Sequence, residues 1–305
     1  MLTFIVMRTL QMVPPLFGLT IILFVLLRIG GDPVAHLVHP DATPAEIQQV
    51  REAYGFDRPW VEQYVRQLTL IVTGDFGDSY RYRAPAMPLV LERLPATLEL
   101  ALASIVIALV IAIPAGILSA VYQNSWLDVL VTVTSTLGRA MPNFWIGIML
   151  ILVVAVQLRW LPVAGRDGLA HLILPAITLG TSLATTIARL LRSSLLEIMR
   201  REFMTTARAK GLRYWTVVLR HGLRNALVAS VTVLGLQVAW LLGGSVIVEE
   251  VFAWPGIGRL MVRSVLLRDL TLVQAGVLVF ALIVMVANLL VDVTYAFINP
   301  RIRFS

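Results

Sequence analysis

Few residues in this chain have the types and spacing that chemistry requires. The only lysine, Lys210, follows Ala209, so the Gly-Lys-Ser/Thr sequence that brings a lysine to nucleotide phosphates is missing. His36 and His39 have His-x-x-His spacing, but no Cys or carboxylate cluster completes a site, so we expect no metal. The absence of cysteine excludes disulfides and thiolate nucleophiles. We therefore predict a protein that is not an enzyme, holds no cofactor of its own and takes its energy from another subunit or a gradient.

The densest polar pattern lies in residues 189–224, where nine basic residues face only two acids, Glu197 and Glu202. Apolar residues recur at helical spacing on both sides of Gly211, a helix stop: Leu196, Met199, Phe203 and Ala207 before it, and Tyr214, Trp215, Val218, Leu219 and Gly222 after it. Two short helices bent at a glycine fit a cleft on a soluble partner. They fit a surface of anionic lipid equally well, so the pattern alone leaves both partners open.

These segments are positioned by a membrane domain. Six runs lack charged residues: 9–27, 100–127, 140–158, 168–188, 225–248 and 270–291. Each reaches the roughly 18–20 residues that cross about 30 Å of hydrocarbon. Charged residues make up only 14% of the chain, which excludes a soluble protein. The first run is long for a signal peptide and has no small-residue cleavage site after it, so we expect it to stay as a span. The fold class is therefore all-α, a polytopic membrane protein with six transmembrane helices.

The arginines set the expected topology. Cytoplasmic loops carry the excess of basic residues, which places the 189–224 segment and both termini, marked by Arg8, Arg301 and Arg303, in the cytoplasm. The 30–99 segment then lies outside, and its six arginines and ten acids give it a net charge of −4. The formal net charge of +7 therefore reflects residues that flank the membrane, and we expect no nucleic acid partner.

The outer segment is predicted to be helical. Thr43 and Glu46 form a capping box with Pro44 at the first helical position, and Gly55 stops that helix. A second helix is expected from Pro59 to near Gly74, with apolar positions Val61, Tyr64, Val65, Leu68, Ile71 and Val72. We favour a cap over the outer mouth, with direct substrate contact as the alternative. The predicted organisation is a first transmembrane helix (1–29), an extracytoplasmic helical segment (30–96), and a five-helix core (97–305) that contains the loop 192–224.

The literal residues decide between the two partners. Thr-Ala-Arg-Ala-Lys-Gly-Leu at 206–212 and His-Gly-Leu-Arg-Asn-Ala at 221–226 resemble the coupling-loop signature of ABC importer permeases in the peptide/nickel branch. Further motifs resemble that family in the same order along the chain, at 31–33, 74–80, 93–100, 142–145, 160–162, 174–176, 243–245, 248–258 and 299–303. Two departures from the general importer loop, Thr205-Thr206-Ala207 in place of Glu-Ala-Ala and Leu223-Arg224 in place of Leu-Pro, fit the peptide branch.

The resemblance implies a type I ABC importer permease in a bacterial or archaeal cytoplasmic membrane. Its implied partners are a second homologous permease, two cytoplasmic ATP-binding subunits that hold ATP and Mg²⁺, an extracytoplasmic solute-binding protein and membrane lipid. It implies substrates delivered by the binding protein: di-, tri- or oligopeptides, with glutathione-like tripeptides and nickel chelates also open. The implied ATPase-coupling residues are Glu202, Phe203, Thr206, Ala207, Arg208, Ala209, Lys210, Gly211, Leu212, His221, Arg224 and Asn225.

The translocation path and the outer gate are less defined by sequence. Uncharged polar residues in the spans, Ser135, Asn143, Gln237 and Ser245, are path candidates, although each could instead hydrogen-bond between helices. In the loop 249–268, Glu249, Trp254, Arg259 and Arg263 are candidates for contact with the binding protein or for an outer gate; the alternative is a helix that seals the outer mouth against lipid. A gradient-driven carrier or channel is the rival function, but such carriers place ionisable groups at mid-membrane, and the centres of the second, fifth and sixth runs have none.

Overall fold

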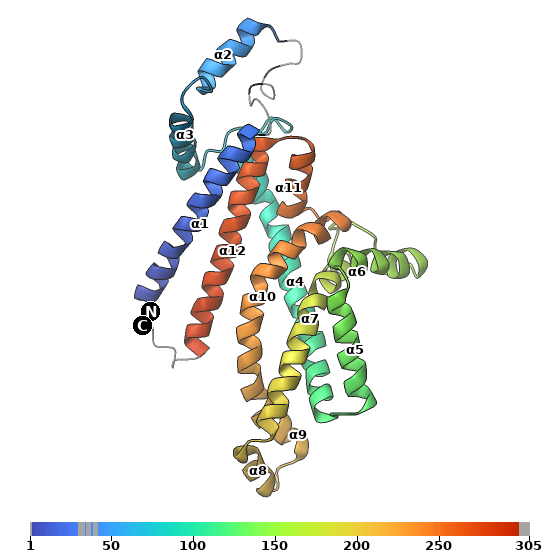
Figure 1. Cartoon of the computed structure of the whole chain (residues 1–305). Coiled ribbons are helices and arrows are strands. Elements are labelled where there is room, and N and C mark those ends of the chain that lie inside the picture. Colours follow the sequence, from blue (N-terminus) through green and yellow to red (C-terminus); the bar gives the residue numbers. More distant parts are fainter. Residues whose placement is uncertain (1, 30–33, 35–37, 39–41, 299–305) are drawn as a thin grey trace. The chain divides into compact units, whose positions relative to one another are not determined.

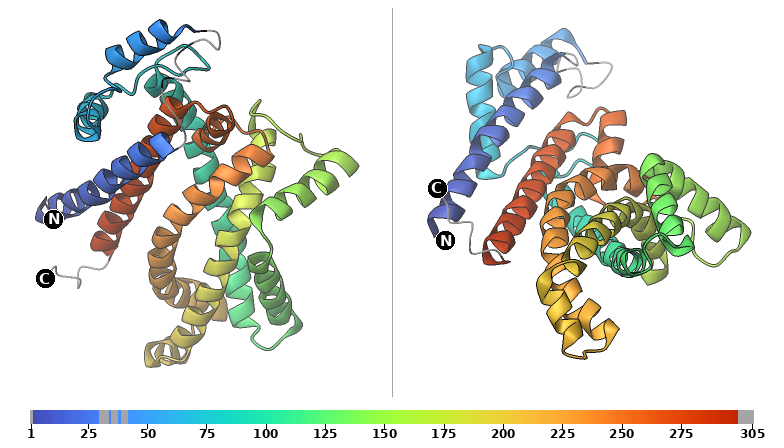
Figure 2. Two further views of the ribbon diagram at one scale, coloured as in Figure 1. Left: turned by 45° about the horizontal axis from the view of Figure 1, so that its top comes forward. Right: turned by 60° about the horizontal axis from the view of Figure 1, so that its bottom comes forward.

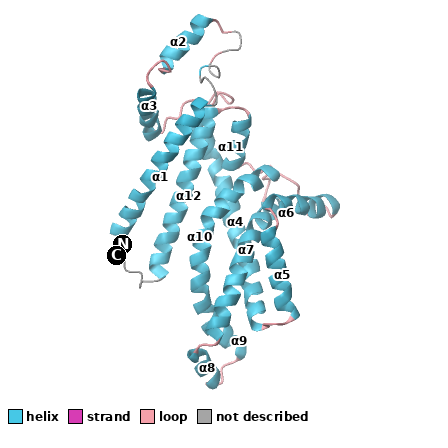
Figure 3. Cartoon of the chain, in the orientation of Figure 1, coloured by secondary structure: helices cyan, strands magenta, loops and turns pink. Residues whose placement is uncertain are grey.

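A computed structural model describes residues 2–29, 34, 38 and 42–298 of the chain. The described part consists of helices joined by loops, with no β-strand among them (Figure 3). In chain order the elements are α1 (Leu2–Ile29), α2 (Pro44–Tyr54), α3 (Trp60–Thr73), α4 (Ala86–Val121), α5 (Trp126–Ala140), α6 (Asn143–Leu150), the π-helix η2 (Ile151–Gln157), α7 (Leu169–Met199), α8 (Glu202–Ala209), α9 (Tyr214–Thr216), the π-helix η3 (Val217–Leu223), α10 (Arg224–Val251), α11 (Ile257–Leu266) and α12 (Leu270–Ile298). The all-α prediction is confirmed over this part of the chain.

Some sequence predictions fall on residues outside the described ones. These are the His36 and His39 pair and the motifs at 31–33 and 299–303, the last of which contains Arg301 and Arg303. They stay predictions.

Four of the described helices are long and apolar enough to cross a membrane. They are the parts of α1, α4, α7 and α12 at Ile5–Leu26, Ala86–Val121, Leu169–Met199 and Leu270–Thr294. The bent pair formed by α5 and α6–η2 raises the count to five if it is one span. The predicted fifth span lies in α10, where the side chains at 228–234, 236 and 238 are not described, so the count of six stays a prediction.

The predicted spans at 100–127 and 140–158 are wrong in their bounds. α4 ends at Val121, and Ser125 starts a new helix by accepting a hydrogen bond from the Asp128 N–H. That helix ends at Ala140, because Pro142 disfavours the helical conformation at Met141, which is extended (φ −83°, ψ 133°). The two pieces Trp126–Ala140 and Asn143–Gln157 make an angle of 107°. The uncharged run at 140–158 therefore begins at a break between two helices and is not part of one straight span.

The chain divides into two compact units, each described here by itself. One unit holds residues 1–95 and 260–286, and the other holds residues 96–259 and 287–305. The predicted boundary at residue 96 falls inside α4, so residues 86–96 are the first turns of a long helix. The predicted loop 192–224 likewise begins inside α7, which continues to Met199.

The first unit contains the two predicted outer helices. The capping box at the start of α2 is present, with the Thr43 N–H donating to Glu46 Oε2 at 2.7 Å and the Glu46 N–H donating to Thr43 Oγ1. The bond from the Thr43 N–H, and after it one from the Thr43 hydroxyl, holds the pKa of the Glu46 carboxyl below its ordinary value, because both donors favour the charged form. Gly55 and Gly74 end α2 and α3 in the left-handed conformation, as the sequence predicts.

The second unit is built on α7, which packs along α10 and α5 (Figures 1 and 2). At one end of α7, a hydrophobic core packs α7 against α4 and against α8 and η3, which follow α7 in the chain. Leu191 and Leu195 of α7 are fully buried there with Ala120 of α4. This core is the platform on which α8 and η3 rest.

Candidate functional site

The candidate site is the bend between α8 and α9. α8 ends at Ala209, and Gly211 then takes a left-handed conformation with φ +76°. Its N–H donates to the Arg208 carbonyl oxygen at 2.9 Å and closes the helix end. A Cβ at this glycine would meet no atom within 4 Å. Glycine is therefore required here by its backbone conformation and not by lack of space, and the predicted bend at Gly211 is confirmed.

One side of the bend is fastened to the chain's own core. Met204 and Ala207 of α8, with Val217, Val218 and Gly222 of η3, are buried. They pack on the α7 and α4 residues of the core described above, with Leu195 and Met204 both close to Gly222. The bend is thus held in place by packing within this chain.

The other side of the bend is open and apolar. Five side chains that are 41–46% exposed form what we call the bend surface: Phe203, Leu212, Tyr214, Trp215 and Leu219. The rings of Tyr214 and Trp215 meet edge to face at 6.0 Å. The exposed residues Arg208, Lys210 and Arg213 lie in the same stretch. An aromatic and basic surface of this kind is what a partner's groove can cover, because Trp, Tyr and Arg dominate binding energy at interfaces.

The faces differ from those predicted by spacing. Phe203 and Ala207 were expected on one apolar face, but Ala207 is buried and Phe203 points outward. After the bend, Val218 is buried whereas Leu219 is exposed. The reason is that each short helix has apolar residues on two sides, one for the core and one for the bend surface, and a count of apolar positions cannot separate them.

The remaining predicted coupling residues flank this surface. Glu202 lies in the first turn of α8, and its carbonyl accepts a bond from Thr206 Oγ1 at 3.1 Å. Ala209 is exposed. Past the bend, Asn225 Nδ2 donates to the His221 carbonyl at 2.7 Å, and Arg224 is exposed. The predicted second short helix is not separate, because α9 runs through η3 directly into α10.

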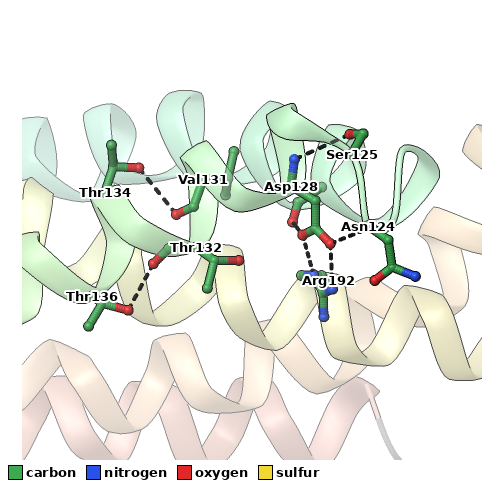
Figure 4. A network of polar contacts seen from close by, with 9 residues as sticks. Asn124, Ser125, Asp128, Val131, Thr132, Thr134, Thr136 and Arg192 are labelled. Carbon is green, nitrogen blue, oxygen red and sulfur yellow. Dashed lines mark hydrogen bonds and ion pairs between the residues drawn. The ribbon is translucent and has the colours of Figure 1, made fainter.

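An ion pair that sequence reasoning missed lies beside the core. Asp128 of α5 is buried and receives two hydrogen bonds from Arg192 of α7, Nε to Oδ1 at 2.7 Å and Nη2 to Oδ2 at 2.8 Å (Figure 4). Ser119 Oγ and the Asn124 N–H donate to the same carboxylate. Arg192 was counted among the basic residues of the loop, but it ties α7 to α5 and to the end of α4. The Ser-x-x-Asp signal at 125–128 could have predicted the start of α5, but not the partner of Asp128.

The turn predicted to lie on the outer face, Glu249 with residues 252–259, is called the outer turn here, and its groups bond within the chain. Glu249 is fully buried, accepting a bond from Thr97 Oγ1 at 2.8 Å and one from the Arg259 N–H at 3.0 Å. Trp254 is also fully buried, and its Nε1–H donates to the Ala96 carbonyl at 2.8 Å. Trp254, predicted to contact the binding protein or to form an outer gate, thus has no exposed surface in this chain.

The two arginines predicted beside this turn differ from each other. Arg259 donates from Nη1 to the Ala253 carbonyl and lies 3.7 Å from Glu250, so it helps to hold the turn. Arg263, further along α11, is exposed. Val265 and Leu266 are 58% and 76% exposed, which fits a surface helix as the sequence predicts.

The four path candidates do not share one environment. Ser135 and Ser245 are buried, and Ser245 Oγ donates to the Leu242 carbonyl at 2.7 Å, the intrahelical use that the alternative reading allows. Asn143 and Gln237 are half-buried. Asn143 begins α6 and lies 3.6 Å from where a Cβ of Gly244 would stand, so α6 and α10 approach each other there.

The fold defines the class of protein. Structures of the MetNI methionine ABC transporter in inward-facing conformations match it with TM-scores of 0.61 and 0.58, at 21% and 20% sequence identity, and each match covers 70% of this chain and 97% of the other. An amino acid ABC transporter solved with histidines matches with a TM-score of 0.52 and 16% identity, over 70% of this chain and 94% of that one. The chain therefore has the fold of a type I ABC importer permease.

Sequence comparison gives the family. The family described as "Binding-protein-dependent transport system inner membrane component" matches residues 112–304, and its N-terminal counterpart matches residues 1–101. The chain belongs to this family and is a permease subunit of an ABC importer, a transport protein and not an enzyme. The family implies a multi-pass membrane location, a partner ATPase and a solute-binding protein.

Two relatives match this chain along its whole length. The glutathione transport system permease protein GsiC of Escherichia coli (strain K12) is 42% identical over 306 residues, and 100% of both chains is covered. The oligopeptide transport system permease protein AppB of Bacillus subtilis (strain 168) is 41% identical over 316 residues, again with 100% of both covered.

Proposed function

We propose that this chain is one of two homologous permeases that together form the path for short peptides, from dipeptides to oligopeptides and including glutathione-like tripeptides. A solute-binding protein delivers the peptide from outside. Two cytoplasmic ATPases, which bind ATP and Mg²⁺, dock on the bend surface and drive the change from inward-open to outward-open. Both termini lie in the cytoplasm, and the segment 30–99 lies outside.

The bend surface carries the docking half of this proposal. Its aromatic side chains are exposed while the opposite side of the same helices is packed on α7 and α4. A partner that moves this surface must therefore also move α7, and through η3 it pulls directly on α10. The substrate half is supported by the full-length likeness to permeases named for glutathione and for oligopeptides.

Transport by the whole assembly tests the substrate. The permease, its second permease, the ATPases and the binding protein are reconstituted in liposomes, and uptake of labelled glutathione and of peptides of increasing length is measured. We expect uptake that requires both ATP and the binding protein. Uptake driven by an ion gradient without ATP would establish the rival carrier mechanism.

Cross-linking tests the docking surface. The chain has no cysteine, so Trp215→Cys introduces a single thiol at the bend surface, and a second cysteine is placed in the groove of the ATPase. We expect a disulfide between them. The control is Trp160→Cys, an exposed tryptophan in the loop between η2 and α7, which should not cross-link. Equal cross-linking at both positions would refute docking at the bend.

Thiol labelling tests the topology. Gln48 lies in α2, in the segment placed outside, and its side chain is exposed. We expect Gln48→Cys to react with a membrane-impermeant reagent added from outside in intact cells. Reaction from the cytoplasmic side alone would reverse the topology.

A further inference from the structure

The outer helix α3 packs against α1 at a position that has a consequence for the membrane. Tyr64 of α3 lies between two aromatic rings of α1, 6.1 Å from the ring of Phe17 and 5.2 Å from that of Phe24. Its hydroxyl shares a hydrogen bond of 2.8 Å with Thr20 Oγ1. Thr20 is itself buried. This contact fixes the level along α1 at which α3 sits.

That level is inside the apolar span of α1. The span runs over Ile5–Leu26, so Thr20 lies six residues before its end. At 1.5 Å per residue, the Tyr64 hydroxyl is about 9 Å below the end of the span along the helix axis. Helices that lie in the membrane interface bury their apolar side about 5–10 Å into the boundary between headgroups and acyl chains. α3 is therefore held at the depth of the membrane and not above it.

The side chains of α3 match this depth. Val61, Val65 and Val72 are 74%, 55% and 84% exposed, and with Leu68 they form one stripe at helical spacing. None of the residues of α3 is buried. A parallel stripe displaced by one residue is polar: Glu62, Arg66, Thr69 and Thr73. The span of α1, against which α3 packs, likewise exposes apolar residues such as Phe17 and Ile21.

We propose that α3 is an interfacial helix whose stripe of Val61, Val65, Leu68 and Val72 inserts into the lipid at the C-terminal end of α1. Tyr64 and Thr20 fix its depth by satisfying each other's hydroxyl groups within apolar surroundings. The lipid leaflet is the outer one under the topology proposed above, and the insertion itself does not depend on that topology. This replaces the sequence-based expectation that the segment only caps the outer mouth.

Accessibility of spin labels tests this proposal on the intact protein. Single cysteines are placed in the stripe (Val61→Cys, Val65→Cys, Val72→Cys) and on the polar side at the matched positions (Glu62→Cys, Thr69→Cys, Thr73→Cys), and the labelled permease is studied in phospholipid nanodiscs with its partner subunits. Oxygen concentrates in lipid and a nickel chelate stays in water. We expect the stripe positions to favour oxygen over the nickel chelate by about threefold or more relative to their neighbours, because neighbouring residues lie at one depth but on different faces.

Two outcomes would overturn the proposal. Equal exposure of both stripes to the nickel chelate would show that α3 lies in water. Exposure of the apolar stripe to water until the solute-binding protein is added, followed by protection, would assign the stripe to that protein. The readout needs no transport, so a failure here leaves the proposed docking of the ATPases untouched, and a failure of cross-linking at Trp215 leaves this proposal untouched.

Discussion

The bend surface and the outer turn contain the same kinds of residues, but the tryptophan is exposed in the first region and buried in the second. Each region contains a tryptophan, charged residues and a glycine. At the bend, Trp215 is 43% exposed and Gly211 has open space around it. At the outer turn, Trp254 is fully buried, and a Cβ at Gly258 would lie 2.6 Å from the Cα of Val246. One region is shaped for a partner, and the other is shaped for the chain itself.

This difference teaches how to read a motif of charged and aromatic residues. Resemblance to a family gives both regions equal weight as sites. Burial separates them, because a side chain with no exposed surface can act on a partner only through its neighbours. Changes at the outer turn should therefore appear first as lost stability, and changes at the bend surface should appear first as lost coupling.

The largest effect is expected for Glu249→Ala. The substitution leaves the Thr97 hydroxyl and the Arg259 N–H without their buried acceptor, which costs about 3 kcal/mol of folding free energy. Thermal unfolding of the purified permease, followed by loss of the monodisperse peak, measures this. Glu250→Ala is the control, since that side chain is 40% exposed. Equal unfolding temperatures for the two variants would contradict the closed outer turn.

A smaller loss of stability is expected at the ion pair beside the core. Asp128→Ala leaves Arg192 without its bidentate partner, and because Arg192 is 28% exposed we expect about 2 kcal/mol and not the full cost of a buried charge. Glu197→Ala breaks the exposed pair with Arg201 and should cost under about 1 kcal/mol. Equal losses in chemical denaturation would mean that the Asp128 pair contributes no more than a surface pair.

Gly211→Val tests the backbone at the bend. A β-branched residue in the left-handed conformation costs about 1–2 kcal/mol, with no steric clash to add to it. We expect the bend to shift and ATP hydrolysis to lose its coupling to transport. Gly243→Ala, also with open space but within α10, should leave both intact. Normal coupling of ATP hydrolysis to transport in Gly211→Val would contradict a role of the bend in coupling.

Trp215→Ala should change partner affinity without changing the fold. The side chain is half exposed and packs only on Tyr214 among aromatic rings in the described chain, so stability should move by no more than about 0.5 kcal/mol. Affinity for the ATPase should fall about tenfold, as for a central aromatic at an interface. Titration of ATPase stimulation measures it. A destabilised permease would erase the distinction between the two regions.

The smallest effect concerns Glu46, an exposed carboxylate that accepts bonds from the Thr43 N–H and hydroxyl, in contrast to the buried Glu249. Because folding lowers the pKa of Glu46, its contribution is fully present above the ordinary carboxyl pKa and is lost as the pH falls through the lowered value. We expect the protection of α2 amides from exchange, corrected for the intrinsic pH dependence of exchange, to fall as the pH drops below the ordinary carboxyl pKa of about 4.3. Glu46→Gln should remove this dependence. The same profile in both proteins would mean that another group titrates.

Local signals predicted much of the fold. The capping box at Thr43, the helix stops at Gly55 and Gly74 and the bend at Gly211 each depend on two or three neighbouring residues, and all appear in the structure. The break at Pro142 depends on residues that are equally local, although a proline in an apolar run also fits a kink within one continuous span. Proline and the extended residue before it were the available signal.

Long-range contacts account for what the sequence did not reveal. The contact between Asp128 and Arg192 joins residues 64 positions apart, and that between Thr97 and Glu249 joins residues 152 apart. Nothing in the spacing of either residue names its partner. Exposure of Phe203 and burial of its near neighbour Met204 likewise depend on which side of α8 the core covers, and that is decided by α7.

The π-helix η3 determines how the bend surface is rotated relative to α10. A π turn bonds each residue to the fifth one along, so it holds more residues than an α turn and thereby sets that rotation. Inserting one residue into the ordinary helix of α10 directly after η3 would rotate the bend surface about 100° around the axis of α10. The partner would then meet the wrong side chains although every one of them is still present. Register at this junction is thus as much a determinant of coupling as the residues themselves.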